Sequence, residues 1–577
     1  MVYRSHVNGI LRLKDVGQKV TLIGWVQRKR NLGSLMFIDL RDRSGIVQLM
    51  IKDPTKVPDV KHEYLIQVQG VVTKKAVANT SLATGEIEVE VTTFKVLNEA
   101  DVLPLIVDDV TDAGEDIRLQ YRYLDLRRRP MQDILITRSK IMQAFHVFFA
   151  KHDFTNIETP LLTLSTPGGA RDFLVPSRLT PGSFYALPQS PQIYKQLLMI
   201  GGLERYYQIA RCFRDEDLRA DRQPDFTQID VEASFLTQDE FLSFMEEAIR
   251  EVFKTVKGIH LPQPFPRLSY ETAMALYGTD KPDLRFDLPL SSIPLILKQA
   301  YEKAGFESSN LKGLKLPNAG GNLSRKVLDE WVTFVKPFGI KGLVTFKLEQ
   351  GQIQSSFLKF VAPESVQELS RLLDLKVGDV YLVASHADLN VLNTAMGILR
   401  TKAAKLLNII DEKKMAIAWV TDFPLFDTNE EGQLVAAHHP FTRPQDQHLS
   451  ILNTQPKKVL AQAYDLVING YEAGGGSMRI YDKEVQKQIF SLLGMTEEAI
   501  QKKFGWFIQA FNYGTPPHGG IAFGLDRLTM ILTGTDNIKD VIAFPKNLKM
   551  VGLLEGTPNT VETKQLDELS IQVKEKK

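Results

Sequence analysis

The chain has 577 residues, 44% of them hydrophobic, and a formal net charge of +1, which is typical of a soluble protein with several domains. Its single cysteine, Cys212, excludes an intramolecular disulfide and a cysteine-rich zinc site. We find no apolar run of about 18 residues, no signal peptide and no transit peptide, so we expect a cytoplasmic protein without a membrane partner. Because the net charge is close to zero, any RNA binding has to come from local basic patches.

The first domain is predicted from short alternating stretches of apolar and polar residues. Five such stretches lie at 20–26, 35–40, 46–51, 64–72 and 86–94. Five strands separated by glycine-bearing turns within about 80 residues favour a small closed barrel, with a generic β-domain as the alternative. A loop-rich linker follows from Asp101 to Asp116.

A helix and a strand come next. Apolar residues recur at helical spacing from Asp133 to His152, which predicts an amphipathic helix. The stretch Phe154–Pro160 then indicates a strand, because proline suits the end or the edge of a sheet. Taken alone, this helix and strand indicate packing rather than chemistry.

The stretch from Phe213 to Glu232 is rich in charge and predicts an anion site. Arg214 precedes several acidic residues and a loop, and its planar guanidinium suits a phosphate on which charge grows. Asp230 and Glu232 are two residues apart, so on a strand they share one face. For any single charge pair, a solvated hairpin is the competing interpretation.

A segment of different character, 288–412, has few polar clusters and is predicted to be an inserted domain. The polar clusters return after it and end near residue 546. Within them, Gly519–Leu528 places glycines before a helix and Arg527 in its first turn. An arginine is unfavourable at that end of the helix dipole, which indicates that it serves an anion or a purine ring. The alternative is a plain glycine-capped helix.

These three stretches, in this order, resemble the three motifs of class II aminoacyl-tRNA synthetases. Further strings match the bacterial aspartyl type: Tyr121–Arg127, Phe184–Gln192 and Asn469–Arg479. The resemblance covers about residues 1–570. It implies an α+β multidomain fold, in which a catalytic domain with an antiparallel sheet is interrupted by an inserted α+β domain of the GAD type. The implied domains are an N-terminal OB-fold barrel that binds the anticodon (1–105), a hinge (106–130), the catalytic domain in two parts (131–287 and 413–560), the insertion (288–412) and a C-terminal extension (561–577).

The activity implied by the resemblance is aspartate–tRNA ligation. ATP activates L-aspartate to aspartyl-adenylate, and the aspartyl group then passes to the 3′ end of tRNA(Asp). Mg²⁺ accompanies the ATP, and no zinc is expected. The family forms homodimers, which would place 133–160 at the interface between two copies.

The resemblance also implies a nucleotide site. Arg214 would hold the α-phosphate and Arg527 the γ-phosphate, which makes them the predicted catalytic residues. Asp465 and Glu472 would hold magnesium, a hard ion that prefers oxygen ligands. The full predicted ATP-binding set is Arg214, Asp215, Glu216, Gln223, Glu472, Gly524, Leu525, Asp526 and Arg527, with Glu216 at the adenine end.

The implied aspartate site contains two cations, Lys195 and Arg479, which match the family's binders of the substrate side chain. Asparagine would leave them partly unpaired, a penalty of roughly several kcal/mol. His438 matches the residue that approaches the substrate ammonium, although a structural role is an equal alternative for a histidine pair. The predicted aspartate-binding set is Gln192, Lys195, Arg214, Asp230, His438 and Arg479.

One position departs from the family pattern. Many bacterial members carry a glutamate in the loop 166–170 that contacts the substrate ammonium, whereas this chain has Gly168 there. Since glycine has no carboxylate, we predict that Asp230 holds the ammonium.

The implied anticodon site lies on the N-terminal barrel. Arg28 and Arg30 would bind phosphate, Phe37 would stack on an unpaired base and Gln48 would bond a base edge. Taken alone, Phe37 would more commonly be buried in the barrel. Leu32 stands where members specific for tRNA(Asp) often have leucine, which favours a discriminating enzyme.

Three alternatives remain open at this point. The first is a non-discriminating form that also charges tRNA(Asn). The second is a class II synthetase for asparagine or lysine, against which the insertion and the pair of Lys195 and Arg479 argue. The third is a non-catalytic tRNA-binding paralogue, which only Gly168 suggests.

Overall fold

The computed structural model describes residues 3–165 and 170–574. Contacts between Cα atoms divide the chain into two compact units, each taken here by itself. The first comprises Met1–Ile136, Leu218–Ala220 and Lys539–Thr560, and the second comprises the remaining three segments. None of the described helices combines the length and the hydropathy needed to span a bilayer.

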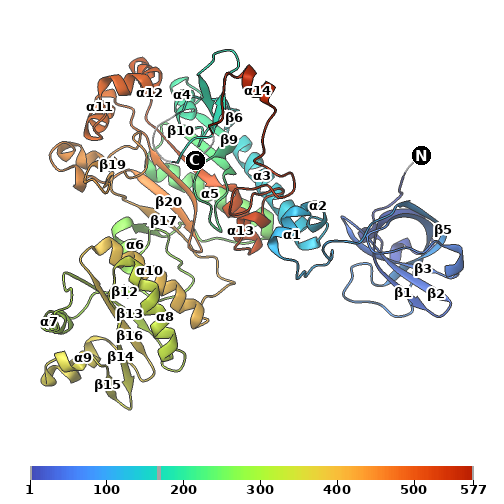
Figure 1. Cartoon of the computed structure of the whole chain (residues 1–577), viewed down its shortest axis with the longest axis horizontal. Helices are drawn as coiled ribbons and strands as arrows, with labels where there is room; N and C mark the ends of the chain where they lie inside the picture. Colours follow the sequence, from blue (N-terminus) through green and yellow to red (C-terminus); the bar gives the residue numbers. More distant parts are fainter. Residues whose placement is uncertain (1–2, 166–169, 575–577) are drawn as a thin grey trace. The chain divides into compact units, whose positions relative to one another are not determined.

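The first unit contains a closed barrel with strand order β1-β2-β3-β5-β4 (Figure 1). Its strands are β1 (Lys19–Leu32), β2 (Leu35–Asp42), β3 (Gly45–Ile51), β4 (Leu65–Lys74) and β5 (Ile87–Asn98). Alternate residues such as Val20, Leu22 and Val26 point inward and are buried, because successive side chains of a strand lie on opposite faces. The five-stranded barrel predicted from the alternation is confirmed.

The string Tyr121–Arg127 has a structural role in the same unit. It follows α1 (Glu115–Gln120) and contains α2 (Arg122–Asp125), and α3 (Arg129–Lys151) comes shortly after it. The buried carboxylate of Asp125 accepts hydrogen bonds from Arg118, Arg122 and Arg128. Arg122 also donates to the carbonyl oxygens of Lys539, Ile542 and Ala543 at 2.8 to 3.0 Å. This arginine cluster therefore ties α2 to the segment 539–543.

The second unit is built on an eight-stranded sheet of order β11-β17-β20-β21-β22-β10-β9-β6. The strands are β6 (Thr155–Asn156), β9 (Arg205–Phe213), β10 (Asp225–Ser234), β11 (Arg267–Ser269), β17 (Ile417–Thr421), β20 (Ala463–Ile468), β21 (Tyr471–Met478) and β22 (His518–Gly524). All neighbours are antiparallel except the outermost pairs, β11 with β17 and β6 with β9.

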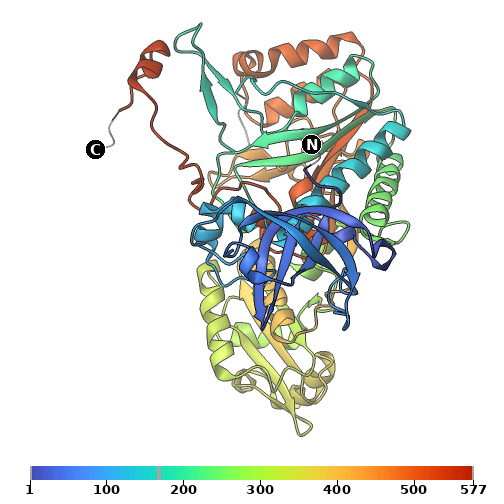
Figure 2. The same cartoon turned by 90° about the vertical axis from the view of Figure 1, so that its right-hand side faces the viewer.

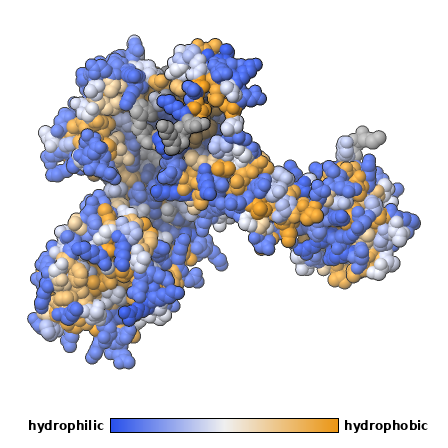
Figure 3. Space-filling model, in the orientation of Figure 1, coloured by the Kyte–Doolittle hydropathy of each residue, from blue (hydrophilic) through white to orange (hydrophobic). Residues whose placement is uncertain are grey.

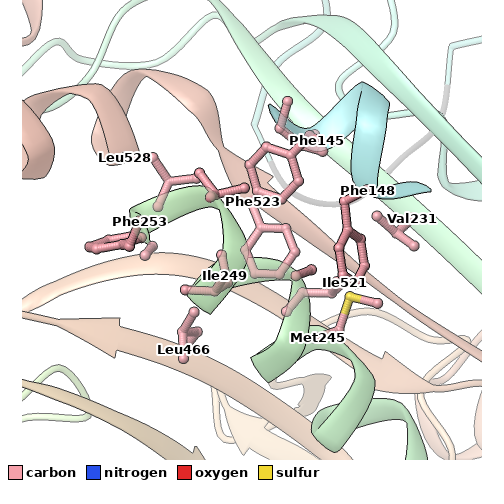
Figure 4. Close-up of a cluster of buried hydrophobic side chains, with 14 of the residues drawn as sticks. Phe145, Phe148, Val231, Met245, Ile249, Phe253, Leu466, Ile521, Phe523 and Leu528 are labelled. Atoms are coloured by element: carbon pink, nitrogen blue, oxygen red, sulfur yellow. The ribbon is translucent and has the colours of Figure 1, made fainter. Parts of the chain in front are cut away.

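Helices cover one face of this sheet, and a second apolar cluster that includes Val420, Ala463 and Val467 lies on part of the other face. Apolar residues of α3 and α5 (Gln238–Lys257) pack on those of β22, as Figure 4 shows for Phe145, Ile249, Ile521 and Phe523. The rings of Phe145 and Phe523 lie 5.8 Å apart. Leu528 of α13 (Leu525–Thr533) joins the same cluster. The helix predicted at 133–152 is thus confirmed, and it begins a few residues earlier.

The second unit also contains two two-stranded sheets and further helices, several of which contribute to the second apolar cluster. They are β7 (Leu174–Pro176), β8 (Phe184–Ala186), α4 (Gln192–Ile200), α6 (Tyr270–Tyr277), β18 (Phe426–Thr428), β19 (Leu434–Ala436), α11 (Lys483–Leu492), α12 (Glu497–Ala510) and α14 (Thr563–Glu568).

A separate five-stranded sheet lies within 288–412, the segment predicted to be an insertion (Figures 1 and 2). Its order is β12 (Leu290–Ser291), β13 (Asn310–Leu316), β16 (Val380–His386), β14 (Val344–Glu349) and β15 (Gln352–Gln354). The accompanying helices are α7 (Leu295–Lys303), α8 (Arg325–Val335), α9 (Val366–Leu372) and α10 (Leu389–Leu406). Two apolar clusters are formed mainly by these elements, so the segment has cores of its own.

The surface carries both kinds of side chain. On the face drawn in Figure 3, hydrophilic residues are interspersed with hydrophobic ones. Scattered apolar residues are normal on a protein surface, so they carry no functional argument by themselves.

Candidate functional site

A cavity of about 510 Å³ opens on the second unit between the β9–β10 hairpin, α4, β20, β21 and the start of α13. It brings together most of the residues that the sequence predicts for the site. Those that line it are Gln192, Lys195, Arg214, Glu216, Gln223, Asp230, His438, Asp465, Glu472, Arg479, Gly524, Asp526 and Arg527.

Four buried charges form one end of the cavity. Lys195 Nζ lies 2.6 Å from Asp230 Oδ1 and 3.2 Å from Glu232 Oε2. Arg479 approaches Glu232 through Nε at 2.9 Å and through Nη2 at 3.2 Å. None of the four side chains is more than 2% exposed. The expectation that Asp230 and Glu232 share one face of a strand is confirmed, because both reach the same ammonium.

The electrostatics of these charges favour ion pairs. Burial opposes the ionisation of Glu232, but Arg479 and Lys195 outweigh it and lower the pKa of that carboxyl. Burial raises the pKa of Asp230, and Lys195 counteracts it only in part. Two cations therefore face two carboxylates, which is the arrangement in which buried charges are tolerated.

Two polar atoms at this end accept or donate no hydrogen bond within the described residues. They are Oδ2 of Asp230, an acceptor, and Nε2 of Gln192, a donor. Both residues line the cavity. A buried polar atom without a partner costs about 1–3 kcal/mol, so the two atoms suit a ligand that carries both a donor and an acceptor.

The two histidines predicted as a pair differ in their contacts. His439 Nε2 lies 2.8 Å from Arg479 Nη1, and burial together with Arg479 holds the pKa of His439 well below its ordinary value, so the ring is neutral. His438 lines the cavity, and its ring is 4.7 Å from that of Phe423. The sequence singled out His438 and missed His439, although the two are adjacent.

The other end of the cavity carries the arginines of the second and third motifs. Arg214 follows β9, and its guanidinium lies 5.0 Å from the centre of the Phe226 ring. Arg527 lies in the first turn of α13, as predicted. It donates to the carbonyl oxygen of Glu472 at 2.9 Å and to Asp221 Oδ2 at 3.3 Å. Both arginines are thus held at the wall of one cavity.

Asp465 of β20 and Glu472 of β21 also meet at this end. A Cβ added to Gly475 would lie 2.7 Å from Asp465 Oδ1 and 3.4 Å from Glu472 Oε1, so both carboxylates flank the same glycine. Burial and Glu472 raise the pKa of Asp465. Burial would also raise the pKa of Glu472, but Lys281 and Arg527 lower it.

This pair of carboxylates fits a magnesium ion. Mg²⁺ usually takes one or two protein carboxylates and completes its shell with water and substrate phosphates. The described residues contain no cluster of three or more His, Cys, Asp or Glu that could hold a metal by themselves. Two oxygen donors at the wall of an open cavity therefore match an ion that arrives with a nucleotide.

Three further residues of the predicted ATP-binding set differ in how they lie relative to the cavity. Asp526 accepts from the backbone N–H of Thr227 at 3.0 Å and from Arg138 Nη1 at 2.6 Å, so both of its oxygens bind the protein. Leu525 is fully buried and does not line the cavity. Asp215 does not line it either, and it lies 3.7 Å from Arg171.

The residues that line the cavity and were missed from the sequence include, besides His439, Phe226, Gln228 and Lys281. Gln228 could have been found, because it is two residues before Asp230 on β10 and shares its face. Lys281 lies in a loop without a periodic pattern, and its ion pair with Glu472 depends on the fold. Gly168, the position that departs from the family pattern, lies outside the described residues.

A second candidate site is the outer face of the barrel. The strand register places Arg28 opposite Asp39, Asp39 opposite Gln48, and Arg30 opposite Phe37. Phe37 is half-buried on this outer face rather than in the core. The face therefore presents the predicted arginines, amide and aromatic ring together.

Acidic residues hold this outer face in place. Arg30 pairs with Asp39 at 3.0 Å, Arg28 with Asp108 at 3.0 Å, and Gln48 donates to Glu88 at 2.9 Å. Leu32 ends β1 and is 65% exposed beside the two-residue turn, where Gly33 has a φ of 61°. The structure thus brings all the predicted anticodon residues onto one surface.

Two family models match the chain. The family described as tRNA synthetases class II (D, K and N) matches residues 114–548. The OB-fold nucleic acid binding domain matches residues 20–97, which contain the barrel.

Relatives match over nearly the whole length. An aspartate–tRNA(Asp/Asn) ligase of Caldanaerobacter subterraneus subsp. tengcongensis is 48% identical over 99% of this chain and 98% of its own. An aspartate–tRNA ligase of Halalkalibacterium halodurans is 48% identical over the same shares. An aspartate–tRNA(Asp/Asn) ligase of Bacillus anthracis is 47% identical over the full length of both chains.

Solved structures share the fold. The asparaginyl-tRNA synthetase of Pyrococcus horikoshii complexed with asparaginyl-adenylate has a TM-score of 0.58 at 18% identity and covers 94% of this chain and 98% of that chain. The Entamoeba histolytica asparaginyl-tRNA synthetase, also with asparaginyl-adenylate, has a TM-score of 0.58 at 19% identity and covers 92% of this chain and 96% of its own.

Proposed function

We infer that this chain joins L-aspartate to tRNA, because it belongs to the bacterial-type aspartate–tRNA ligases among the class II tRNA synthetases. ATP first converts aspartate to aspartyl-adenylate, and the aspartyl group then passes to the 3′ end of tRNA(Asp). The observation that carries this inference is the convergence of Lys195, Arg479, Arg214 and Arg527 in one cavity. Those cations come from separate parts of the chain, and their meeting in one cavity supports a shared anionic ligand.

The amino-acid end suits aspartate. Lys195 and Arg479 offer cations to the substrate side-chain carboxylate, and Gln192 offers a free amide donor. The free Oδ2 of Asp230 supports the role of ammonium acceptor for this residue. An asparagine side chain would offer these two buried cations no further negative charge, which disfavours it. His438 completes the pocket near the ammonium.

The nucleotide end suits ATP. In the attack of the carboxylate on the α-phosphorus, positioning and charge neutralisation dominate. Arg214 would bind the α-phosphate and the aspartate carboxylate that attacks it. Arg527 would bind the γ-phosphate. Glu216 and Gln223 would contact the base and ribose end. Gly524 and Asp526 would form part of the wall around the nucleotide, whereas Asp215 and Leu525 lie outside the cavity lining.

Asp465 and Glu472 would hold Mg²⁺ when ATP binds. The ion supplies positive charge to the phosphates. The two carboxylates flank Gly475, and Arg527 Nη1 lies 3.7 Å from Glu472 Oε2. We expect no zinc requirement.

The domain organisation follows from this activity. We propose that 1–105 reads the anticodon through Arg28, Arg30, Phe37 and Gln48, and that 106–130 is the hinge. The catalytic domain would comprise 131–287 and 413–560, the insertion 288–412 and the C-terminal extension 561–577. Translation enzymes of this kind work in the cytoplasm, where we place the chain.

There are two candidates for the set of tRNAs that this protein charges. Leu32 favours restriction to tRNA(Asp), whereas two of the relatives are named for both tRNA(Asp) and tRNA(Asn). Charging of transcripts with aspartate and asparagine anticodons decides between them. Equal rates on both would establish the relaxed form.

A homodimer is proposed through the second half of α3 and the segment after it. Val147 is 70% exposed, Leu161 48% and Leu162 52%, and a second copy would cover them. The double variant V147E/L162D should halve the mass measured by light scattering. The matched control is Leu295→Asp, a residue 67% exposed on α7, which should leave the mass unchanged.

The activity is tested by amino-acid-dependent exchange of pyrophosphate into ATP. Exchange with aspartate, and not with asparagine or lysine, is expected. Exchange with asparagine or lysine instead would identify another synthetase of this subgroup. No exchange with any of the three, together with intact tRNA binding, would indicate a non-catalytic paralogue.

A further inference from the structure

Lys281 reaches the nucleotide end of the cavity from a loop outside the three motifs. The loop follows α6 and leads into β12, the first strand of the insertion. Lys281 Nζ lies 2.7 Å from Glu472 Oε2, while Arg527 Nη1 lies 3.7 Å from the same oxygen. The ammonium therefore stands beside the arginine that would bind the γ-phosphate.

Lys281 is accessible from the cavity. Its side chain is 36% exposed and lines the cavity, so a ligand can reach it. A charged ammonium has three donors, and one bond to Glu472 leaves donors for a phosphate.

The insertion holds the loop that carries Lys281. Arg400, on α10 of the insertion, is 1% exposed. Its guanidinium donates to the carbonyl oxygens of Asp283 at 3.0 Å, Phe286 at 3.2 Å and Leu288 at 2.7 Å. The nearest of these carbonyls, that of Asp283, is two residues from Lys281, so the arginine anchors the loop close to the lysine.

A second contact fixes the start of the loop. Gly278 has a φ of 67°, and a Cβ there would lie 2.1 Å from the carbonyl oxygen of Asn393 and 2.7 Å from the amide nitrogen of Gly397. A Cβ on Gly397 would in turn lie 2.6 Å from the carbonyl oxygen of Tyr277. The backbones of α10 and of the C-terminal end of α6 therefore touch directly, which only glycines permit.

We propose that Lys281 binds the pyrophosphate portion of ATP, and that Arg400 of the insertion is the positioning residue that holds it there. The proposal rests on the proposed function. Without ATP, Lys281 is paired with Glu472. When a triphosphate enters, its β- and γ-phosphate oxygens compete for the ammonium, which needs only a small movement of a long side chain. The insertion thereby gains a role in ATP binding although none of its side chains enters the cavity.

The role of Lys281 is tested with Lys281→Met and Lys281→Arg. In exchange assays, Lys281→Met should raise the KM for ATP about tenfold or more, the loss expected for one hydrogen bond to a charged group, and leave the KM for aspartate unchanged. Equilibrium binding should weaken for ATP but not for AMP, which lacks the pyrophosphate. Lys281→Arg should recover most of the ATP affinity. Lys298→Met, an exposed lysine of α7, is the control. Equal effects on ATP and AMP, or no effect on either, would overturn the proposal.

The role of Arg400 is tested by a double-mutant cycle. Arg400→Met should raise the KM for ATP several-fold, yet add little in the K281M background, because both changes remove the same contact. Arg400→Lys, which keeps a cation, should fold and show a smaller, equally non-additive effect. Lys405→Met on the same helix should change nothing. Fully additive effects would refute the positioning role.

The test of Lys281 and the test of the proposed function can fail independently of each other. If the parent protein fails to exchange with aspartate, the assigned activity is wrong. The difference between ATP and AMP binding at Lys281 is measured without an amino acid and stands or falls by itself.

Discussion

At the scale of single residues, Asp230 offers the sharpest test of amino-acid recognition. Its Oδ1 pairs with Lys195, and its Oδ2 is free for an ammonium. Asp230→Ala should raise the KM for aspartate by about a hundredfold, since a charge-assisted contact is lost and Lys195 loses a partner. The KM for ATP should change little. Steady-state exchange kinetics measure both, and an unchanged KM for aspartate would move the ammonium site elsewhere.

His439 gives a pH dependence of stability with a definite sign. Its pKa is held well below the ordinary value of 6.5, so the unfolded chain binds more protons than the folded one as the pH falls through that value. Stability should therefore decrease on acidification from about pH 7 to pH 5, by up to about 1.4 kcal/mol per pH unit for one proton. The lowered pKa of Glu232 leaves its contribution intact until lower pH.

Thermal midpoints across this pH range test the prediction. His439→Gln should flatten the dependence, because the glutamine does not titrate. His518, whose pKa burial also lowers, should account for part of the remaining slope. The same slope in the parent and in the variant would exclude His439 as its source.

At the scale of elements, Asp526 joins three of them. Its carboxylate, in the first turn of α13, binds the backbone of β10 at Thr227 and the side chain of Arg138 on α3. Asp526→Ala should lower the free energy of unfolding by about 1–3 kcal/mol, because it removes a hydrogen bond to a charged guanidinium and one to a backbone N–H. It should also raise the KM for ATP through the displacement of Arg527. Denaturation by urea and exchange kinetics measure the two effects. A loss of ATP affinity at full stability would instead place Asp526 in contact with the nucleotide.

An element can be predicted from the sequence when the residues that determine it are neighbours along the chain. Alternation of apolar residues predicted the barrel strands, and helical spacing predicted α3, because both patterns reflect neighbours along the chain. The resemblance to known motifs named Lys195, Arg214 and Arg479, which the structure gathers in one cavity. It did not find Lys281 or Arg400, whose partners are distant in sequence and lie in segments without such a motif.

At the scale of the whole molecule, the residues predicted for the anticodon and those predicted for adenylate formation lie in different units. Phe37→Ala on the barrel should reduce kcat/KM for tRNA about tenfold, the contribution of one stacked base, and leave aspartate-dependent exchange intact. Lys95→Ala, an exposed residue of β5, is the control. Aminoacylation and exchange are measured side by side. An equal loss in both assays would mean that the substitution damages the fold.

The direct backbone contact between Gly278 and Gly397 limits how this protein can be shortened. Joining the chain across the insertion would strip three carbonyl groups of their shared guanidinium and leave the loop before them without support. A shortened protein that keeps its ATP affinity would need a linker in place of the insertion. It would also need another donor for the carbonyl oxygens that Arg400 now binds. Any side chain at Gly278 or Gly397 should push the backbones of α6 and α10 apart. We expect the first consequence to be weaker binding of ATP.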